Sequence, residues 1–172
     1  MTAARRRDEI LQALAGVSGP VSAAALAARL GVSRQVVVGD VALLRAAGSP
    51  IVATPRGYVL GGGQEGSGVR CTVACRHGLD GLLDELYTVA DCGCGVLDVT
   101  VEHPVYGQLS GRLELSSRYD VGEFIRRVKE EGAKPLSVLT DGIHLHTLRC
   151  PDEDAFQRVR TALDAAGFLV KE

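Results

Sequence analysis

The chain has 172 residues, 46% of them hydrophobic and 23% charged, which excludes a disordered protein and fits one ordinary domain or two small ones. No apolar run approaches the roughly 18–20 residues that cross a bilayer, and the basic N-terminus lacks the apolar segment of a signal peptide, so we expect a cytoplasmic protein. The net charge of −2 conceals an asymmetry, because residues 1–60 carry +4 and residues 61–172 carry −6, which favours a polyanion-binding arm on a body that does not bind polyanions.

The first third of the chain has the pattern of a winged helix-turn-helix. Three helices are predicted, at residues 4–15, 23–30 and 34–48. Ser22 and Ser33 are good N-caps for the second and third of them. Residues 50–60 then predict two short strands around a turn that contains Pro55 and Gly57. In this order of elements the third helix is the recognition helix and residues 54–58 form the wing.

Four residues of this region are predicted to contact DNA. Ser33, Arg34 and Gln35 lie at the N-terminus of the recognition helix, where such proteins touch bases and phosphates. Arg pairs with guanine and Gln with adenine, and Arg56 in the wing could reach a phosphate or the minor groove. Many small helical domains carry surface arginines without binding DNA. The ordered motif, the positive charge and the wing together favour double-stranded DNA as a partner.

Residues 61–68, GGGQEGSG, are predicted to be a flexible linker, because they are glycine-rich, polar and aperiodic. They divide the chain into a DNA-binding domain at 1–60 and a second domain at 69–172. Strands are predicted in the second domain at 69–77, 95–103, 104–115 (after a turn), 135–140, 143–149 and 168–170, and helices at 79–92, 120–132 and 152–167. The predicted fold class is therefore α+β, in which the winged helix-turn-helix precedes an α/β sandwich with helices on one face of a mainly antiparallel sheet.

Three histidines and one glutamate are candidate metal ligands. His144 and His146 lie two residues apart in a predicted strand, so their side chains share one face of the sheet. His77 ends another strand, and Glu85 follows eight residues later in a helix. Three imidazoles and a carboxylate suit Zn, Ni, Fe or Mn. The residues alone leave a structural or surface role for the histidine pair equally open.

The cysteines offer a competing metal site. Cys71, Cys75 and His77 fall on one face of a predicted strand, and Cys92 and Cys94 close the next helix. These spacings differ from those of zinc knuckles, so we expect the five cysteines to be free thiols, mostly buried as small apolar residues. No nucleophile motif, phosphate-binding loop or dinucleotide-binding motif is present, so nothing in the sequence supports an enzyme.

Several stretches of the chain together carry a family resemblance. They are SRQVVVGDVALLRAAG at 33–48, IVATPRGYVL at 51–60, His77 with Glu85 and Leu86, HPVYG at 103–107, SRYDVGEF at 117–124, and PLSVLTDGIHLHTL at 135–148. HPVYG together with LTDGIHLHT is the most specific part, since many regulators share helix-turn-helix residues. On these stretches the sequence resembles, over nearly its whole length, the niacin-responsive transcriptional repressor family NiaR, which joins a winged helix-turn-helix to a 3H domain named for its histidines.

The resemblance implies a repressor of genes for NAD biosynthesis or niacin uptake, with nicotinic acid as co-repressor. It implies a divalent metal, Ni or Zn in type, held by three histidines and a glutamate that match His77, Glu85, His144 and His146 here. It also implies a homodimer, which suits a palindromic operator. Gly39 stands where a longer polar residue is expected in this family's recognition helix, so the operator sequence is not predicted.

The resemblance further suggests how the effector binds. The carboxylate or ring nitrogen of nicotinate could complete the coordination of the metal, with His103 lining the pocket and Tyr106 and Arg118 as candidate ring and anion contacts. Two other classes of protein remain open. One is a metal-binding sensor, or a metal-dependent hydrolase, of another pyridine-type ligand fused to a DNA-binding arm. The other is a transcription factor without an effector, in which the metal only stabilises the fold.

Overall fold

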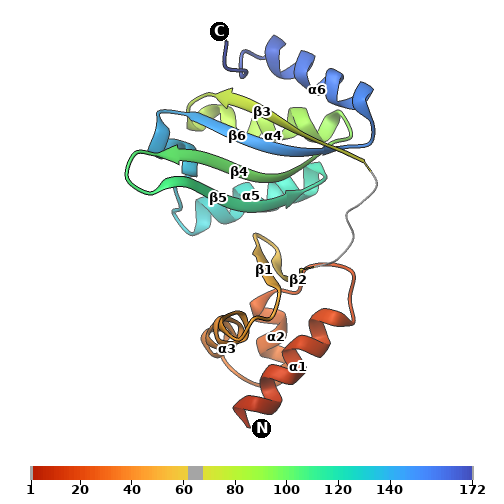
Figure 1. Ribbon diagram of the computed structural model, residues 1–172, viewed down its shortest axis with the longest axis vertical. Coiled ribbons are helices and arrows are strands. Elements are labelled where there is room, and N and C mark those ends of the chain that lie inside the picture. Colours follow the sequence, from red (N-terminus) through yellow and green to blue (C-terminus); the bar gives the residue numbers. More distant parts are fainter. Residues whose placement is uncertain (1, 62–67, 172) are drawn as a thin grey trace. The chain divides into compact units, whose positions relative to one another are not determined.

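The computed structural model describes residues 2–61 and 68–171 and divides into two compact units, residues 1–66 and 67–172 (Figure 1). The predicted linker at 61–68 lies, except for its two end residues, outside the described residues. Among the helices that are described, none is both long and apolar enough to cross a membrane.

The N-terminal unit is the predicted winged helix-turn-helix. Its elements are α1 (Ala3–Ala15), α2 (Ala23–Leu30), α3 (Arg34–Ala46), β1 (Ile51–Thr54) and β2 (Gly57–Leu60). Both predicted N-caps are formed, since the Ser22 hydroxyl accepts from the Ala25 amide at 3.0 Å and the Ser33 hydroxyl from the Val36 amide at 3.3 Å. The core consists of the apolar faces of the three helices and β1, with Ile10, Leu14, Leu26, Leu30, Val37, Val41 and Ile51 buried.

A buried ion pair joins the first helix to the recognition helix. Asp40 of α3 is 4% exposed and accepts two hydrogen bonds from the Arg6 guanidinium of α1, at 2.5 and 3.2 Å. Arg7 lies 3.6 Å from the same carboxylate. A carboxylate at this depth needs such partners, because an unpaired buried charge is strongly destabilising. The pair therefore fixes the position of α3 on α1.

The wing is a short antiparallel hairpin in which Ile51 pairs with Leu60 and Thr54 with Gly57. The Thr54 hydroxyl donates to the Gly57 carbonyl at 2.9 Å and accepts from the Arg56 amide at 3.2 Å. Gly57 has φ +139°, and a Cβ at this residue would lie 2.3 Å from the carbonyl oxygen of Val21. Only glycine fits there, so the base of the wing packs directly on the backbone that leads into α2.

The C-terminal unit is built on a four-stranded antiparallel sheet with the order β3-β6-β4-β5. The strands are β3 (Val69–Arg76), β4 (Gly95–His103), β5 (Gly107–Leu115) and β6 (Ile143–Cys150), and the helices are α4 (Leu82–Asp91), α5 (Arg118–Glu130) and α6 (Glu153–Ala165). The helices share one buried core with the sheet, to which they contribute Leu86, Val121 and Val159. The predicted α+β architecture is confirmed.

The predicted strand at 135–140 is wrong. Residues 136–140 form a 3₁₀ helix, η2 (Leu136–Thr140), which ends at Asp141 in the left-handed conformation. The Gly142 amide donates to the Ser137 carbonyl at 2.9 Å, so the segment satisfies its own backbone instead of pairing with a strand.

Three other elements differ in extent from the prediction. The helix predicted from Asp120 begins at Arg118, because the Ser117 hydroxyl caps it by accepting from the Asp120 amide at 3.1 Å. The helix predicted at 79–92 starts as a 3₁₀ turn, η1 (Leu79–Gly81), before α4. The predicted last strand is reduced to one bridge between Leu169 and Cys75.

Candidate metal centre

The four predicted metal ligands come from three elements that meet at one end of the sheet. His77 follows β3 directly, Glu85 lies in the first turn of α4, and His144 and His146 belong to β6. Pairing of β3 with β6 sets Cys75 opposite His144, so His77 and the two other imidazoles reach the same face. His144 and His146 are each 2% exposed and Glu85 is fully buried.

The three imidazoles converge on the Glu85 carboxylate through the same ring atom. Nε2 of His77 lies 2.5 Å from Oε2, and Nε2 of His144 lies 3.1 Å from both carboxylate oxygens. Nε2 of His146 lies 3.4 Å from Oε2. The rings stand edge to face, with centroids 4.9 Å apart for His77 and His144 and 4.8 Å apart for His144 and His146.

The other nitrogen of each ring is fixed by the backbone. Nδ1 of His77 donates to the carbonyl of Gly78 at 2.8 Å, that of His144 to Gly142 at 2.8 Å, and that of His146 to Asp98 at 2.7 Å. A carbonyl oxygen only accepts, so each Nδ1 carries the hydrogen and each Nε2 is left with its lone pair toward Glu85. This arrangement, in which a backbone carbonyl orients each ring, is typical of metal-binding histidines.

A β-bulge provides the carbonyl that orients His146. The register of β4 against β6 shifts between Val96 and Asp98. Leu97 is an extra residue of β4 that has no partner in β6. The bulge lets the Asp98 carbonyl bond to the imidazole while the Asp98 carboxylate accepts from the Thr147 amide at 3.1 Å.

In the resulting cluster, hydrogen-bond acceptors face one another. Three Nε2 lone pairs and two carboxylate oxygens cannot hydrogen-bond one another unless a cation stands between them. Among the described buried side chains, Nε2 of His146 is the polar atom without a hydrogen-bond partner. The donor set of three imidazole nitrogens and one carboxylate therefore fits a divalent metal of the Zn or Ni type.

The same geometry shifts the pKa of the groups in the absence of metal. Burial lowers the pKa of His77 and of His146, but the adjacent Glu85 carboxylate outweighs burial, and both pKa values are raised. Burial raises the pKa of Glu85, but the three adjacent imidazoles outweigh burial, and this pKa is lowered. The cluster thus attracts positive charge, either as protons or as a metal ion.

Cys75 is a further buried donor beside the site. Its sulfur and the ligand atoms of Glu85 and His144 lie within 4.8 Å of one another. Burial, followed by the charge of Glu85, raises the pKa of the Cys75 thiol strongly. The spacing of Cys75 and His77 at i and i+2 indicated a common face, but the sequence associated this thiol with a separate cysteine site.

A pocket of about 510 Å³ opens beside the metal centre. It is lined by Arg76, His77, Gly78, Leu79, Ser137, Val138, Asp141 and Gly142. At its wall, Nη2 of Arg76 forms an ion pair with Oδ2 of Asp141 at 2.9 Å. Arg76, Leu79 and Val138 were not among the predicted site residues. Leu79 and Val138 lie in 3₁₀ helices, which have no distinctive sequence pattern, and Arg76 ends a strand as an ordinary exposed residue.

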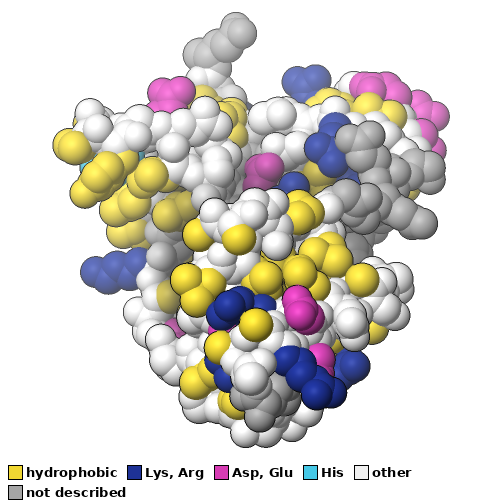
Figure 2. Space-filling view, turned by 60° about the horizontal axis from the view of Figure 1, so that its bottom comes forward, with side chains coloured by type: hydrophobic (Ala, Val, Ile, Leu, Met, Phe, Trp, Pro, Cys, Tyr) yellow, Lys and Arg dark blue, Asp and Glu magenta, His cyan; other side chains and the backbone are white. Residues whose placement is uncertain are grey.

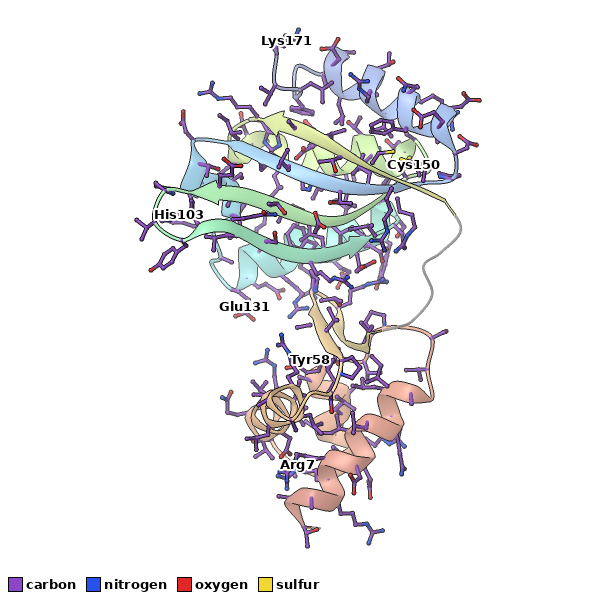
Figure 3. All side chains as sticks on the ribbon, in the orientation of Figure 1. Arg7, Tyr58, His103, Glu131, Cys150 and Lys171 are labelled. Carbon is purple, nitrogen blue, oxygen red and sulfur yellow. The ribbon has the colours of Figure 1, made fainter. Side chains whose placement is uncertain are left out.

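His103 and Tyr106 lie on the β4–β5 hairpin and are not among the residues that line the pocket. Nδ1 of His103 accepts from the amides of Val105 and Tyr106 at 3.1 and 3.2 Å, so this histidine caps the turn. Figure 3 shows His103 at the hairpin end of the sheet and Cys150 at the opposite end. The ring of Tyr106 packs on His103 at 5.0 Å and is 75% exposed.

Arg118 is not gathered with the metal ligands either. It forms two hydrogen bonds with the carboxylate of Asp91, at 2.5 and 2.6 Å, and its guanidinium stacks on the ring of Tyr87 at 4.3 Å. Asp91 is the last residue of α4, whereas Glu85 lies in its first turn. The predicted anion contact is therefore occupied by another carboxylate.

The candidate DNA contacts of the N-terminal unit are all exposed. Ser33, Arg34 and Gln35 lie at the start of α3, and Arg56 lies in the turn of the wing. Figure 2 shows several arginine side chains on the face of this unit that is turned forward.

Comparison with known proteins gives the family. The chain matches the HTH domain over residues 6–59 and the 3H domain over residues 70–172. It is 44% identical over 167 residues to a protein of Thermotoga maritima named probable transcription repressor NiaR, covering 97% of this chain and 94% of the relative. It is 41% identical over 171 residues to the transcription repressor NadR of Bacillus subtilis, covering 98% and 95%. Both relatives are named as repressors and not as enzymes, and the chain belongs to the NiaR/NadR family of transcription repressors.

Proposed function

We propose that the chain represses genes of NAD biosynthesis or niacin uptake by binding an operator in double-stranded DNA, with nicotinic acid as co-repressor at a metal centre in the C-terminal unit. The observation that carries the proposal is the convergence of three Nε2 atoms on the buried Glu85 carboxylate. Such a cluster is costly to bury unless it binds a cation.

The proposed metal ligands are His77, Glu85, His144 and His146. When bound, a divalent ion of the Ni or Zn type supplies positive charge and a coordination position for a carboxylate or a pyridine nitrogen. The protein holds the three rings by carbonyls of Gly78, Gly142 and Asp98, so the ligand atoms are oriented before the ion arrives.

The pocket beside His77 is the proposed effector site. Its volume of about 510 Å³ lies within the range of roughly 300–1,000 Å³ that is typical of small-molecule sites. Leu79 and Val138 offer apolar surface to a flat ring, and His77 belongs to both the pocket and the metal centre. A ligand in this pocket is therefore sensed by groups that also hold the metal.

The N-terminal unit is proposed to read the operator with Ser33, Arg34 and Gln35 of α3 and with Arg56 of the wing. A homodimer would present two recognition helices to the two halves of a palindromic operator. Nicotinate would act as co-repressor by binding more tightly to the dimer whose two α3 helices match the operator, since only differential affinity shifts such an equilibrium.

The test combines metal analysis, calorimetry and operator binding. We expect the protein, loaded with Ni or Zn, to bind nicotinate saturably near one per subunit, and this binding to vanish on chelation. The change His144→Gln should abolish tight metal binding and the niacin response of operator binding while leaving the fold intact, because it removes one buried ligand. His103→Gln, on the hairpin, is the matched control and should keep both. A His144→Gln protein that still responds fully to niacin would contradict the proposal.

A further inference from the structure

We propose that Arg76 binds the carboxylate of the effector, and that Asp141, its present partner, competes with that carboxylate for the guanidinium. This inference rests on the proposed function, in which an aromatic monocarboxylate occupies the pocket beside the metal centre. According to this inference, the Arg76–Asp141 ion pair in the pocket wall determines whether the protein prefers an aromatic acid to the corresponding amide.

Arg76 is held at the pocket by its backbone and remains accessible to solvent. It is the last residue of β3, pairs with Ile143 of β6, and donates its amide to the Phe168 carbonyl at 2.8 Å. Its side chain is 57% exposed. The adjoining residue, His77, is a proposed metal ligand, and Arg76 and His77 both line the pocket.

The charges of the pocket single out Arg76 as its anion-binding group. Among the described residues that line the pocket, the acidic and basic side chains are those of Asp141 and Arg76, and the others, apart from His77, are apolar, glycine or serine. The ion pair with Asp141 joins Nη2 to Oδ2 at 2.9 Å and uses one of the five N–H donors of the guanidinium. A planar carboxylate can pair with the guanidinium at two points, which is the stronger geometry.

Asp141 stands on backbone that is coupled to the metal ligands. It adopts φ +52°, which is uncommon for a residue with a side chain, and is followed by Gly142. A Cβ on Gly142 would lie 2.4 Å from the carbonyl oxygen of His77, and the Gly142 carbonyl accepts from Nδ1 of His144. The backbone that carries the competing carboxylate therefore belongs to the same turn that orients a proposed metal-binding ring.

The exchange of one carboxylate for another gives selectivity for acids. When Arg76 leaves Asp141, it loses a negatively charged partner. A carboxylate ligand provides another one, whereas a neutral amide does not. Removal of the Asp141 charge should then tighten the binding of the acid, and removal of the Arg76 charge should weaken it. Neither change should affect the binding of the amide to the same degree.

The experiment titrates metal-loaded, full-length protein with nicotinate and with nicotinamide by calorimetry. Four proteins are compared: the wild type, Arg76→Gln, Asp141→Asn and Arg118→Gln. Loss of a charged hydrogen-bond pair predicts about a tenfold or greater loss of nicotinate affinity in Arg76→Gln, with nicotinamide affinity unchanged. Asp141→Asn should bind nicotinate several-fold more tightly. Arg118→Gln breaks a similar exposed Arg–Asp pair away from the pocket and should behave like the wild type.

The outcomes distinguish failure of the proposed function from failure of the proposed role of Arg76. If the wild type binds no nicotinate, the proposed effector is wrong, and the role of Arg76 falls with it. If the wild type binds nicotinate and Arg76→Gln binds it equally well, the proposed function stands and this inference is overturned. Metal content is measured for every variant. If Arg76→Gln does not fold, Asp141→Asn decides, because an unchanged affinity in that variant also overturns the inference.

Discussion

The tautomeric state of three imidazoles determines the chemistry of the candidate centre. Because each Nδ1–H is committed to a carbonyl, every ring presents its Nε2 lone pair to the cavity. A cluster of histidines with random tautomers could satisfy itself by internal hydrogen bonds. This one needs positive charge between the Nε2 atoms and Glu85, which either protons or a metal ion can supply.

The sequence predicted part of this centre from local spacing alone. His144 and His146 share a face because strand side chains repeat every two residues. His77 and Glu85 contact this histidine pair only because β3 pairs with β6. In that pairing Arg76 lies opposite Ile143, which is 67 residues later in the sequence. Periodicity carries no information about such a distant pairing, so His77 and Glu85 were candidates by residue type alone and the family resemblance strengthened the assignment.

The buried thiols should be chemically silent in the folded protein. Burial is the largest cause that raises the pKa of Cys150, to about 12, and burial also raises the pKa of Cys75 and Cys94. A raised pKa makes the reactive thiolate rarer at a given pH, about one molecule in 10,000 for Cys150 at pH 8.

Alkylation with iodoacetamide at pH 8, followed by mass spectrometry, measures this directly. We expect Cys75, Cys94 and Cys150 to be modified only after denaturant is added, whereas the partly exposed Cys71 and Cys92 react first. Rapid modification of Cys150 in the native protein would show that the end of β6 opens to solvent.

At the scale of elements, the recognition helix carries a residue that weakens it. Gly39 lies on the exposed side of α3, and a Cβ at this residue would meet no described atom within 4 Å. Glycine in a helix interior costs about 1 kcal/mol relative to alanine. The change Gly39→Ala should therefore raise the free energy of unfolding of the N-terminal unit by about 1 kcal/mol, as measured by denaturant titration. If the variant is equally stable or less stable, the backbone of α3 needs the conformational freedom of glycine at this residue even without DNA bound.

Most helices and strands follow from the sequence, and the failures have local causes. In α5 two residues could serve as the cap, and Ser117 takes this role while Asp120 is buried in the first turn and accepts from the Ser116 amide and hydroxyl. The apolar residues of η2 partly alternate as in a strand, but the segment turns back on itself, and the Gly142 amide donates to the Ser137 carbonyl. The pocket residues Leu79 and Val138 lie in the two 3₁₀ helices, so the effector site was the least predictable part of the fold.

At the scale of the whole molecule, the two compact units should respond separately to metal and to mutation. If the proposed ion neutralises the buried Glu85 cluster, chelation should remove it and the C-terminal unit should lose stability. For a ligand at a thousand times its dissociation constant the expected loss is about 4 kcal/mol. Calorimetric unfolding of the full chain should then show one transition that moves to lower temperature on chelation and one that does not.

The change Gly39→Ala provides the matched control in the same measurement. It should move the transition that chelation leaves in place, because it lies in the N-terminal unit and far in sequence from the metal ligands. If both treatments displace the same transition, the chain unfolds as a single cooperative block and the metal supports the whole of it.

The bulge in β4 has a consequence for how such a protein can change in evolution. Leu97 adds a residue that releases the Asp98 carbonyl from the ladder and gives it to His146. A deletion there would restore regular pairing and leave the imidazole unanchored, although no ligand would have been replaced. The constraint therefore falls on the length of the strand as much as on its residue types, and a descendant that keeps His146 anchored to the Asp98 carbonyl must keep the spacing of this strand.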